Sequence, residues 1–185
     1  CEKPITVDPG QCERIIAAAA DATVYVMEAM WTWFLPAIRK AKQWVDEGRI
    51  GRLLRLSRLF LTDPAGDRML ARPHWSHGLP GGRWFETLPH ALYLTHHFLG
   101  PLEPVAVTAL ATPSAPAGAP ADEVTLLFRG PGGLADVHYS ANCGLNRRWL
   151  TLWGTRGQIA IDLLADSATL ATRRDSRPRR VVGGL

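Results

Sequence analysis

The sequence predicts an α+β fold, in which helices cover one face of a large and mostly antiparallel β-sheet. Two observations predict it. Residues 36–47 and 90–99 have the apolar spacing of helices, whereas the apolar period after Gly100 falls to about two residues. The later segments follow one another through short turns, and strands joined in this way pair antiparallel. A sheet with one apolar face then needs the helices as its cover.

The two helices have recognisable ends. Pro36 suits a first helical turn and Gly48 suits the position just after a last one, which bounds a helix over residues 36–47. Its apolar side chains form a single stripe. They are Leu35, Ile38, Ala41 and Val45. Gly100 and Pro101 end the second helix, over residues 90–99.

Seven segments have the composition of strands. They are residues 53–62, 105–111, 123–129, 134–141, 149–153, 158–163 and 168–172. In the first of them, we expect Leu54, Leu56 and Phe60 to share one side. Glycines at residues 130–133 predict a hairpin turn, and the Pro/Ala-rich residues 113–120 form a linker. The long irregular segment 63–83 is of the kind that often carries function.

The beginning of the chain has a different rhythm. Residues 1–6 suggest the end of a buried strand, residues 11–20 a short alanine-rich helix, and residues 23–27 a second buried strand. Strand, helix and strand in this order are typical of a parallel sheet. We therefore expect two units: residues 1–28, the end of one domain, and residues 29–185, the α+β domain.

Composition excludes several classes of protein. No apolar run approaches the roughly 18 residues of a membrane helix. The net charge is +4, with an arginine-rich stretch near the end that we interpret as a solvated turn or tail. Nucleic-acid binding is the alternative, but no aromatic stacking platform accompanies the arginines. The three cysteines, Cys1, Cys12 and Cys143, make no disulfide framework and favour a cytoplasmic location.

Four short motifs, in order, resemble one enzyme family. They are Glu2-Lys3-Pro4, the segment Met27–Pro36, the glycine turn Gly48-Arg49-Ile50-Gly51, and a block with Gly81-Gly82, Glu86, His90 and Leu99-Gly100. Together they resemble the glucose–fructose oxidoreductase and inositol dehydrogenase (Gfo/Idh/MocA) family. The resemblance covers nearly the whole chain. Where the family usually has aspartate, this chain has Glu86.

The resemblance implies that a dinucleotide-binding Rossmann domain precedes the sheet domain. It also places Cys1 near the end of that Rossmann half, so we expect the chain to lack the family's phosphate-binding glycine turn and its final helices. No G-x-G-x-x-G motif occurs in the sequence. The implied cofactor is NAD or NADP, held mostly by residues outside this chain, with Glu2, Lys3 and Pro4 on its nicotinamide side.

The resemblance also implies the chemistry, which is the interconversion of a secondary alcohol of a sugar, polyol or diol with a ketone. His90 is the candidate proton acceptor, because imidazole titrates near neutral pH. Glu86 lies four residues earlier, and if this segment is helical the two side chains share one face, where the carboxylate can hold the imidazole ring or bind a substrate hydroxyl. Lys3 can hydrogen-bond the reacting hydroxyl, and in the family the Lys-Pro bond is often cis. The alternatives are a helix-capping histidine, a surface carboxylate and a solvated lysine.

Three tryptophans are candidates for a sugar-binding wall, because apolar sugar faces stack on aromatic rings. They are Trp31, Trp33 and Trp84, and core packing is the alternative role of each. The six histidines form no strong metal motif, so we expect no metal. The expected partners are a small-molecule substrate and further copies of the chain through the β-sheet, with no nucleic acid and no membrane. A non-catalytic assembly module or pseudo-enzyme of the same fold is the competing hypothesis.

Overall fold

The computed structural model of the chain describes residues 1–63, 74–112, 121–173 and 179–182. Its helices are α1 (Pro9–Asp21), η1 (Trp31–Phe34), α2 (Pro36–Asp46), η2 (Trp75–Gly78), α4 (Arg83–Thr87) and α5 (Pro89–Leu99). Its strands are β1 (Leu53–Leu61), β2 (Glu103–Leu110), β3 (Glu123–Gly130), β4 (Gly133–Ser140), β5 (Arg147–Gly154), β6 (Gly157–Asp162), β7 (Ser167–Thr172) and β8 (Arg179–Val182). The predicted linker 113–120 and most of the predicted loop 63–83 lie outside the described residues.

The strands form a single eight-stranded sheet with the order β2-β3-β4-β1-β5-β6-β7-β8. β1 pairs in parallel with β4 and antiparallel with β5, and the other described neighbours are antiparallel. The α+β class with a mostly antiparallel sheet is therefore confirmed. β1 lies between β4 and β5, which run in opposite directions, so β1 is parallel to one of them and antiparallel to the other.

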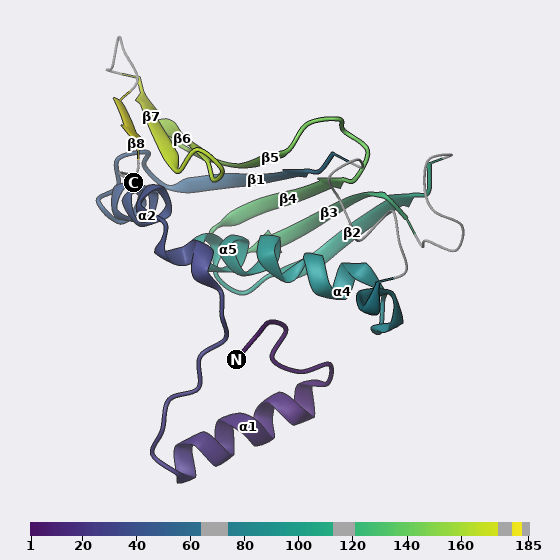
Figure 1. The fold of residues 1–185 in the computed structure, drawn as a ribbon. Helices are drawn as coiled ribbons and strands as arrows, with labels where there is room; N and C mark the ends of the chain where they lie inside the picture. Colours follow the sequence, from purple (N-terminus) through teal and green to yellow (C-terminus); the bar gives the residue numbers. More distant parts are fainter. Residues whose placement is uncertain (64–73, 113–120, 174–178, 183–185) are drawn as a thin grey trace.

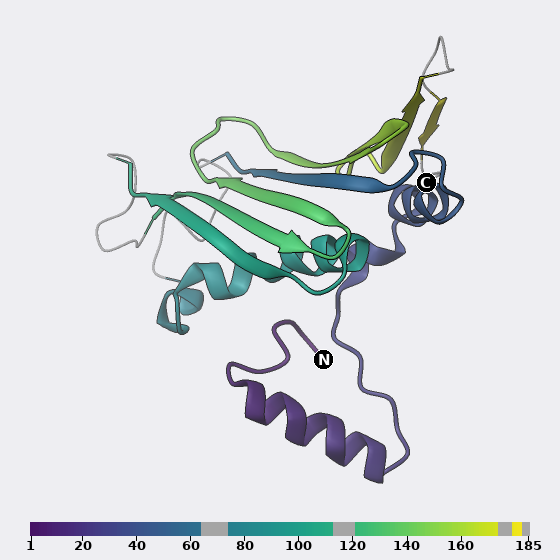
Figure 2. The ribbon, with the colours of Figure 1, turned by 180° about the vertical axis from the view of Figure 1, so that it is seen from behind.

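Helices α2, α4 and α5 lie on the same side of the sheet in both views (Figures 1 and 2). The main core fills the space between them and the sheet. Its fully buried members include Ile38 of α2, Leu56 of β1, Leu94 of α5 and Leu150 of β5, each with 0% exposure. At about 25 cal/mol per Å² of apolar surface, this burial is the main stabilising contribution to the fold.

The two faces of β1 differ from the sequence prediction at one position. Leu56, Arg58 and Phe60 share the helix-covered side, but Leu54 does not, and its side chain is 40% exposed. The cause is a shift of register between Leu53 and Arg55, a bulge that adds one residue and reverses the alternation. Leu53, rather than Leu54, packs into the core.

The segment before α2 contains the predicted helix but neither of the two predicted strands. The helix is present as α1, with Asp8 accepting a hydrogen bond from the backbone N–H of Gln11 at its beginning. Residues 1–6 and 23–27, however, are neither strands nor buried, and Tyr25 is fully exposed. A strand requires a neighbour to pair with, and no described strand lies beside either segment. Figure 1 shows α1 well away from the sheet.

The arginine-rich end of the chain is also more ordered than expected. Arg179 and Arg180 belong to β8, which pairs with β7 at the edge of the sheet. The interpretation of this stretch as a turn or tail is therefore wrong for those two residues. Arg174 and Arg177 lie outside the described residues.

Candidate active site

Two glycines set the direction of α4. Gly81 and Gly82 have φ angles of +77° and +60°, in the left-handed region that side chains with a Cβ rarely adopt. The chain turns there and enters α4 at Arg83. Pro89 has no N–H to continue a helical ladder, and it separates α4 from α5. α5 confirms the helix predicted over residues 90–99, but Glu86 and His90 belong to two consecutive helices and not to one. Glu86 is near the end of α4 and His90 is in the first turn of α5.

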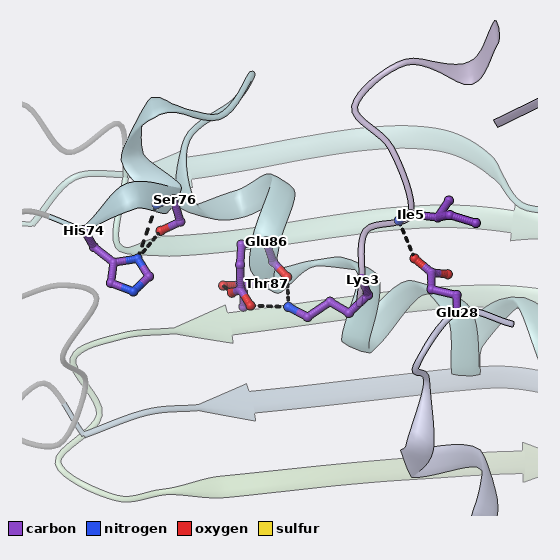
Figure 3. A network of polar contacts seen from close by, with 7 residues as sticks. All are labelled: Lys3, Ile5, Glu28, His74, Ser76, Glu86 and Thr87. Carbon is purple, nitrogen blue, oxygen red and sulfur yellow. Dashed lines mark hydrogen bonds and ion pairs between the residues drawn. The ribbon is translucent and has the colours of Figure 1, made fainter. Parts of the chain in front are cut away.

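Lys3 reaches Glu86 across 83 residues of sequence. Its Nζ donates to the backbone carbonyl of Glu86 at 2.6 Å and forms an ion pair with Oε1 of the same residue. The other carboxylate oxygen, Oε2, accepts a hydrogen bond from the Thr87 hydroxyl at 3.1 Å (Figure 3). The side chains of Lys3 and Glu86 are only 10% and 12% exposed, so this pair is mostly removed from water.

Hydrogen bonds hold the segment that carries Lys3. The backbone N–H of Ile5 donates to Glu28 Oε1 at 3.0 Å (Figure 3), and the amino group of Cys1 donates to the Met27 carbonyl at 2.8 Å. The Lys3–Pro4 peptide bond is cis, as the family resemblance implied. Glu2 is exposed and Pro4 partly exposed, so Lys3 alone of the three motif residues enters the site deeply.

His90 lies within the electrostatic reach of Lys3 and Glu86. Burial of the ring is the largest cause that lowers its pKa below the ordinary 6.5, and the charge of Lys3 is the second. Glu86 acts in the opposite direction, and Arg58 and Arg148 lower the pKa further. The imidazole is therefore neutral at pH 7 and able to accept a proton. The charge of Lys3 thus acts on His90, and the convergence of the two side chains on one cleft stays a prediction.

The three tryptophans are dispersed. Trp84 packs edge-on against Tyr139, with ring centroids 4.8 Å apart, beside a small apolar cluster, which is the core-packing alternative. Trp33 stacks on His97 of α5 at 4.2 Å, and Trp31 is 63% exposed. The structure thus does not bring Trp31, Trp33 and Trp84 together as one wall.

Sequence reasoning missed two arginines beside this region, Arg58 and Arg148. Arg58 is 2% exposed on the helix-covered side of β1, and Arg148 lies over the ring of Phe60 with its Cζ 3.4 Å from the centroid. The sequence contains a signal for Arg58. Alternate residues of a strand share one face, so Arg58 between Leu56 and Phe60 is a charged side chain on an otherwise apolar face.

Other histidines and acidic residues have local roles. His74 Nδ1 bonds both the backbone and the hydroxyl of Ser76 at the start of η2 (Figure 3). Within residues 1–63, 74–112, 121–173 and 179–182, no three His, Cys, Asp or Glu side chains gather as metal ligands. Every helix in those ranges is too short or too polar to cross a bilayer.

A family model described as the GFO/IDH/MocA C-terminal domain matches residues 38–160. The chain belongs to this family. The match covers α2, the region of α4 and α5, and the sheet as far as β6. The family assignment made from the four sequence motifs is therefore confirmed.

The curated relatives that this chain resembles include dehydrogenases. The trans-1,2-dihydrobenzene-1,2-diol dehydrogenase of Oryctolagus cuniculus is 26% identical over 160 residues, which is 85% of this chain and 46% of that enzyme. The NADP-dependent D-xylose 1-dehydrogenase of Hypocrea jecorina is 33% identical over 55 residues, 30% of this chain and 14% of the enzyme. The chain spans about half the length of the diol dehydrogenases that it matches along most of its own length.

Solved structures of the Gfo/Idh/MocA type share the fold over the whole chain. An NAD-binding oxidoreductase from Klebsiella pneumoniae superposes with a TM-score of 0.83 at 24% identity, covering 100% of this chain and 54% of that one. A levoglucosan dehydrogenase in complex with NADH gives a TM-score of 0.82, also at 24% identity, with the same coverage of 100% and 54%. At this identity the likeness establishes the fold.

The arrangement of charges around His90 predicts two opposite pKa shifts. Lys3→Met removes a positive charge and should raise the His90 pKa, whereas Glu86→Gln removes a negative charge and should lower it. NMR titration of the His90 ring protons measures both. His97 serves as an internal control and should not respond, because burial, His96 and Lys42 lower its pKa. Shifts of the same sign in both variants would contradict the arrangement.

Proposed function

We propose that this chain is the substrate-side domain of an NAD(P)-dependent oxidoreductase that interconverts a secondary alcohol of a sugar, polyol or related diol with a ketone. The observation that carries the proposal is the Lys3–Glu86 ion pair next to a neutral, half-buried His90. Removal of a proton from a hydroxyl group is helped by a neutral base and by a positive charge near the oxygen. Membership of a family that includes diol and sugar dehydrogenases supports it.

His90 is the proton acceptor in this proposal. When an alcohol is oxidised, its hydroxyl proton must leave, and a neutral imidazole accepts it. The lowered His90 pKa keeps the ring unprotonated at neutral pH, so the base is available without a preceding deprotonation. In the reverse direction the protonated ring returns the proton to the oxygen of the ketone.

Lys3 polarises the reacting oxygen. An ammonium group has three N–H donors, and the described bonds of Lys3 direct two of them to Glu86. The third is available for the substrate oxygen, where a positive charge lowers the pKa of an alcohol and stabilises a developing alkoxide. Glu86 keeps the ammonium in position and compensates its charge, which glutamate does here in place of the family's aspartate.

The nicotinamide cofactor fits the residues at the start of the chain. Lys3 enters the site while Glu2 and Pro4 remain accessible beside it, so this turn is the part of the chain that would contact the nicotinamide. A bound nicotinamide accepts or donates the hydride. A Rossmann domain would hold the pyrophosphate at a glycine-rich turn, and it would also hold the adenosine ribose, whose 2′-position distinguishes NAD from NADP. The free thiols Cys1, Cys12 and Cys143 support a reducing location such as the cytoplasm.

Turnover by the enzyme that contains this domain and its dinucleotide-binding half tests the proposal. His90→Ala should lower kcat/KM by about 100- to 10,000-fold, the usual contribution of a general base. Lys3→Met should also lower kcat, because the third donor and the charge are lost together. NAD(P)H absorbance with a panel of polyols and diols is the measurement.

The neighbouring His96 provides the matched control. It lies on the same helix but is exposed, so His96→Ala should leave turnover unchanged. Circular dichroism of each variant checks that the fold is retained. Full activity in folded His90→Ala would exclude the assigned role and favour a pseudo-enzyme.

A second candidate function is assembly of subunits through the sheet. Its face opposite the helices carries several large apolar side chains. They are Leu127, Leu134 and Trp149, with exposures of 42%, 56% and 44%. Figures 1 and 2 show no helix over this face, and exposed apolar surface of this kind favours protein association.

Sedimentation of the chain tests the assembly proposal. The wild type should form a dimer, and Leu134→Glu should shift it to a monomer by placing a charge in the interface. Leu164→Glu is the matched control, because Leu164 is equally exposed, at 59%, but lies in the turn between β6 and β7. A wild type that remains monomeric would contradict assembly through this face.

A further inference from the structure

Arg58 holds a positive charge in the interior of the protein. Its side chain is 2% exposed, and Nη1 donates to the Trp149 carbonyl at 3.0 Å, but its buried Nε has no hydrogen-bond partner among the residues that the structure describes. Among the described residues, no carboxylate forms an ion pair with it. Burial lowers the pKa of Arg58 to about 9, which expresses the cost of holding this charge away from water. Such a cost is rarely retained for stability alone.

Arg148 adds a second positive charge to the same place. The two residues come from adjacent antiparallel strands, β1 and β5, and both guanidinium groups contact the ring of Phe60. The Cζ–centroid distances are 5.6 Å for Arg58 and 3.4 Å for Arg148. Arg148 also donates to the Leu61 carbonyl and, at 3.2 Å, to the Thr62 hydroxyl. The two cations repel each other, and the charge of Arg148 therefore lowers the Arg58 pKa further.

The ring that the two arginines share leads toward the candidate catalytic residues. Phe60 stacks on Tyr139, and Tyr139 packs edge-on against Trp84 of α4, the helix that carries Glu86. Both arginines lower the pKa of His90, so their charges act at the position where a substrate would be converted. The carboxylate described next to His90 is Glu86, and Lys3 already neutralises it. Phe60, which packs on both arginines, and Arg148 itself are partly exposed, so the pair reaches the surface of the protein. The positive electrostatic potential around Arg58 and Arg148 favours a negatively charged ligand.

We propose that Arg58 and Arg148 bind the oxyanion of a negatively charged, hydroxyl-bearing substrate, such as the carboxylate of a sugar acid. The inference rests on the proposed function, because it names the substrate class of the same site. Guanidinium groups bind planar oxyanions through paired hydrogen bonds, and the bound anion would give the unpaired Arg58 donor an acceptor. A phosphate ester offers the same chemistry from another source.

Binding measured without cofactor tests this inference separately from turnover. Isothermal titration of the full chain compares glucuronate, glucose 6-phosphate and glucose at one low ionic strength. One of the two acids should bind at least about tenfold more tightly than glucose, since charge-assisted hydrogen bonds contribute at this level. The acid that binds identifies the source of the oxyanion. Equal binding of all three sugars would overturn the proposal.

Arg58→Met separates ligand binding from a structural role of the arginine. Methionine fills similar space without charge, so the variant should be as stable as the wild type or more stable, while its affinity for the acid falls at least about tenfold. Arg55→Met is the matched control on the opposite face of β1, where Arg55 pairs with Asp136 at 2.7 Å, and it should bind the acid normally. Reduced stability with unchanged acid binding would show that Arg58 only supports the fold.

Two further outcomes keep the proposals distinct. If Arg58→Met does not fold, Arg58→Lys retains the charge but not the planar group, and it should still weaken acid binding. If acids bind no better than glucose while turnover of neutral polyols depends on His90, the oxidoreductase proposal stands and the anion site does not. If acids bind more tightly than glucose and His90→Ala leaves turnover intact, the anion site stands and the assigned role of His90 in the oxidoreductase proposal does not.

Discussion

The contact between Lys3 and Glu86 joins two parts of the chain that otherwise share little surface. α1 has no buried residue, yet Lys3, which precedes it, reaches α4 through an ion pair and a backbone hydrogen bond. Because both side chains are mostly buried, breaking the pair would leave a charge without compensation, which is costly. This pair therefore fixes where the Glu-Lys-Pro turn lies relative to His90.

The electrostatic character of the site follows from an excess of cations around one carboxylate. Burial, Lys3, Arg58 and Arg148 all disfavour a proton on His90, and among the described residues Glu86 favours it. The sheet supplies two of these charges from adjacent strands, and the N-terminal segment supplies the third. The result is a neutral base in a positive field. Such a field suits both a developing alkoxide and a substrate that carries its own negative charge.

Most of the sheet domain could be predicted because its signals are local. The period-two pattern located β2 to β7, and Pro36, Gly48 and Gly100 bounded the helices. The central position of β1, its parallel pairing with β4 and the bulge that turns Leu54 outward depend on contacts between distant segments, which no local pattern encodes. The strands expected at residues 1–6 and 23–27 failed for the same reason, since local composition does not supply a pairing partner.

The candidate site was predictable to the extent that short motifs carried it. Glu86, His90 and Lys3 stand in motifs, and the structure brings Lys3 and Glu86 into contact. The tryptophans were proposed on residue type alone, and packing disperses them instead. Arg58 and Arg148 belong to no motif, and they acquire meaning only when β1 and β5 pair and place both guanidinium groups on Phe60.

A crystal structure of the complete enzyme with its cofactor and a bound substrate would test the central claim most directly. The claim is that an imidazole and an ammonium act on one oxygen atom. The account predicts that a ring nitrogen of His90 and Nζ of Lys3 both lie within about 3.2 Å of the substrate oxygen at the carbon that exchanges hydride. A substrate oxygen held by other groups, with the His90 ring turned away from it, would contradict the account.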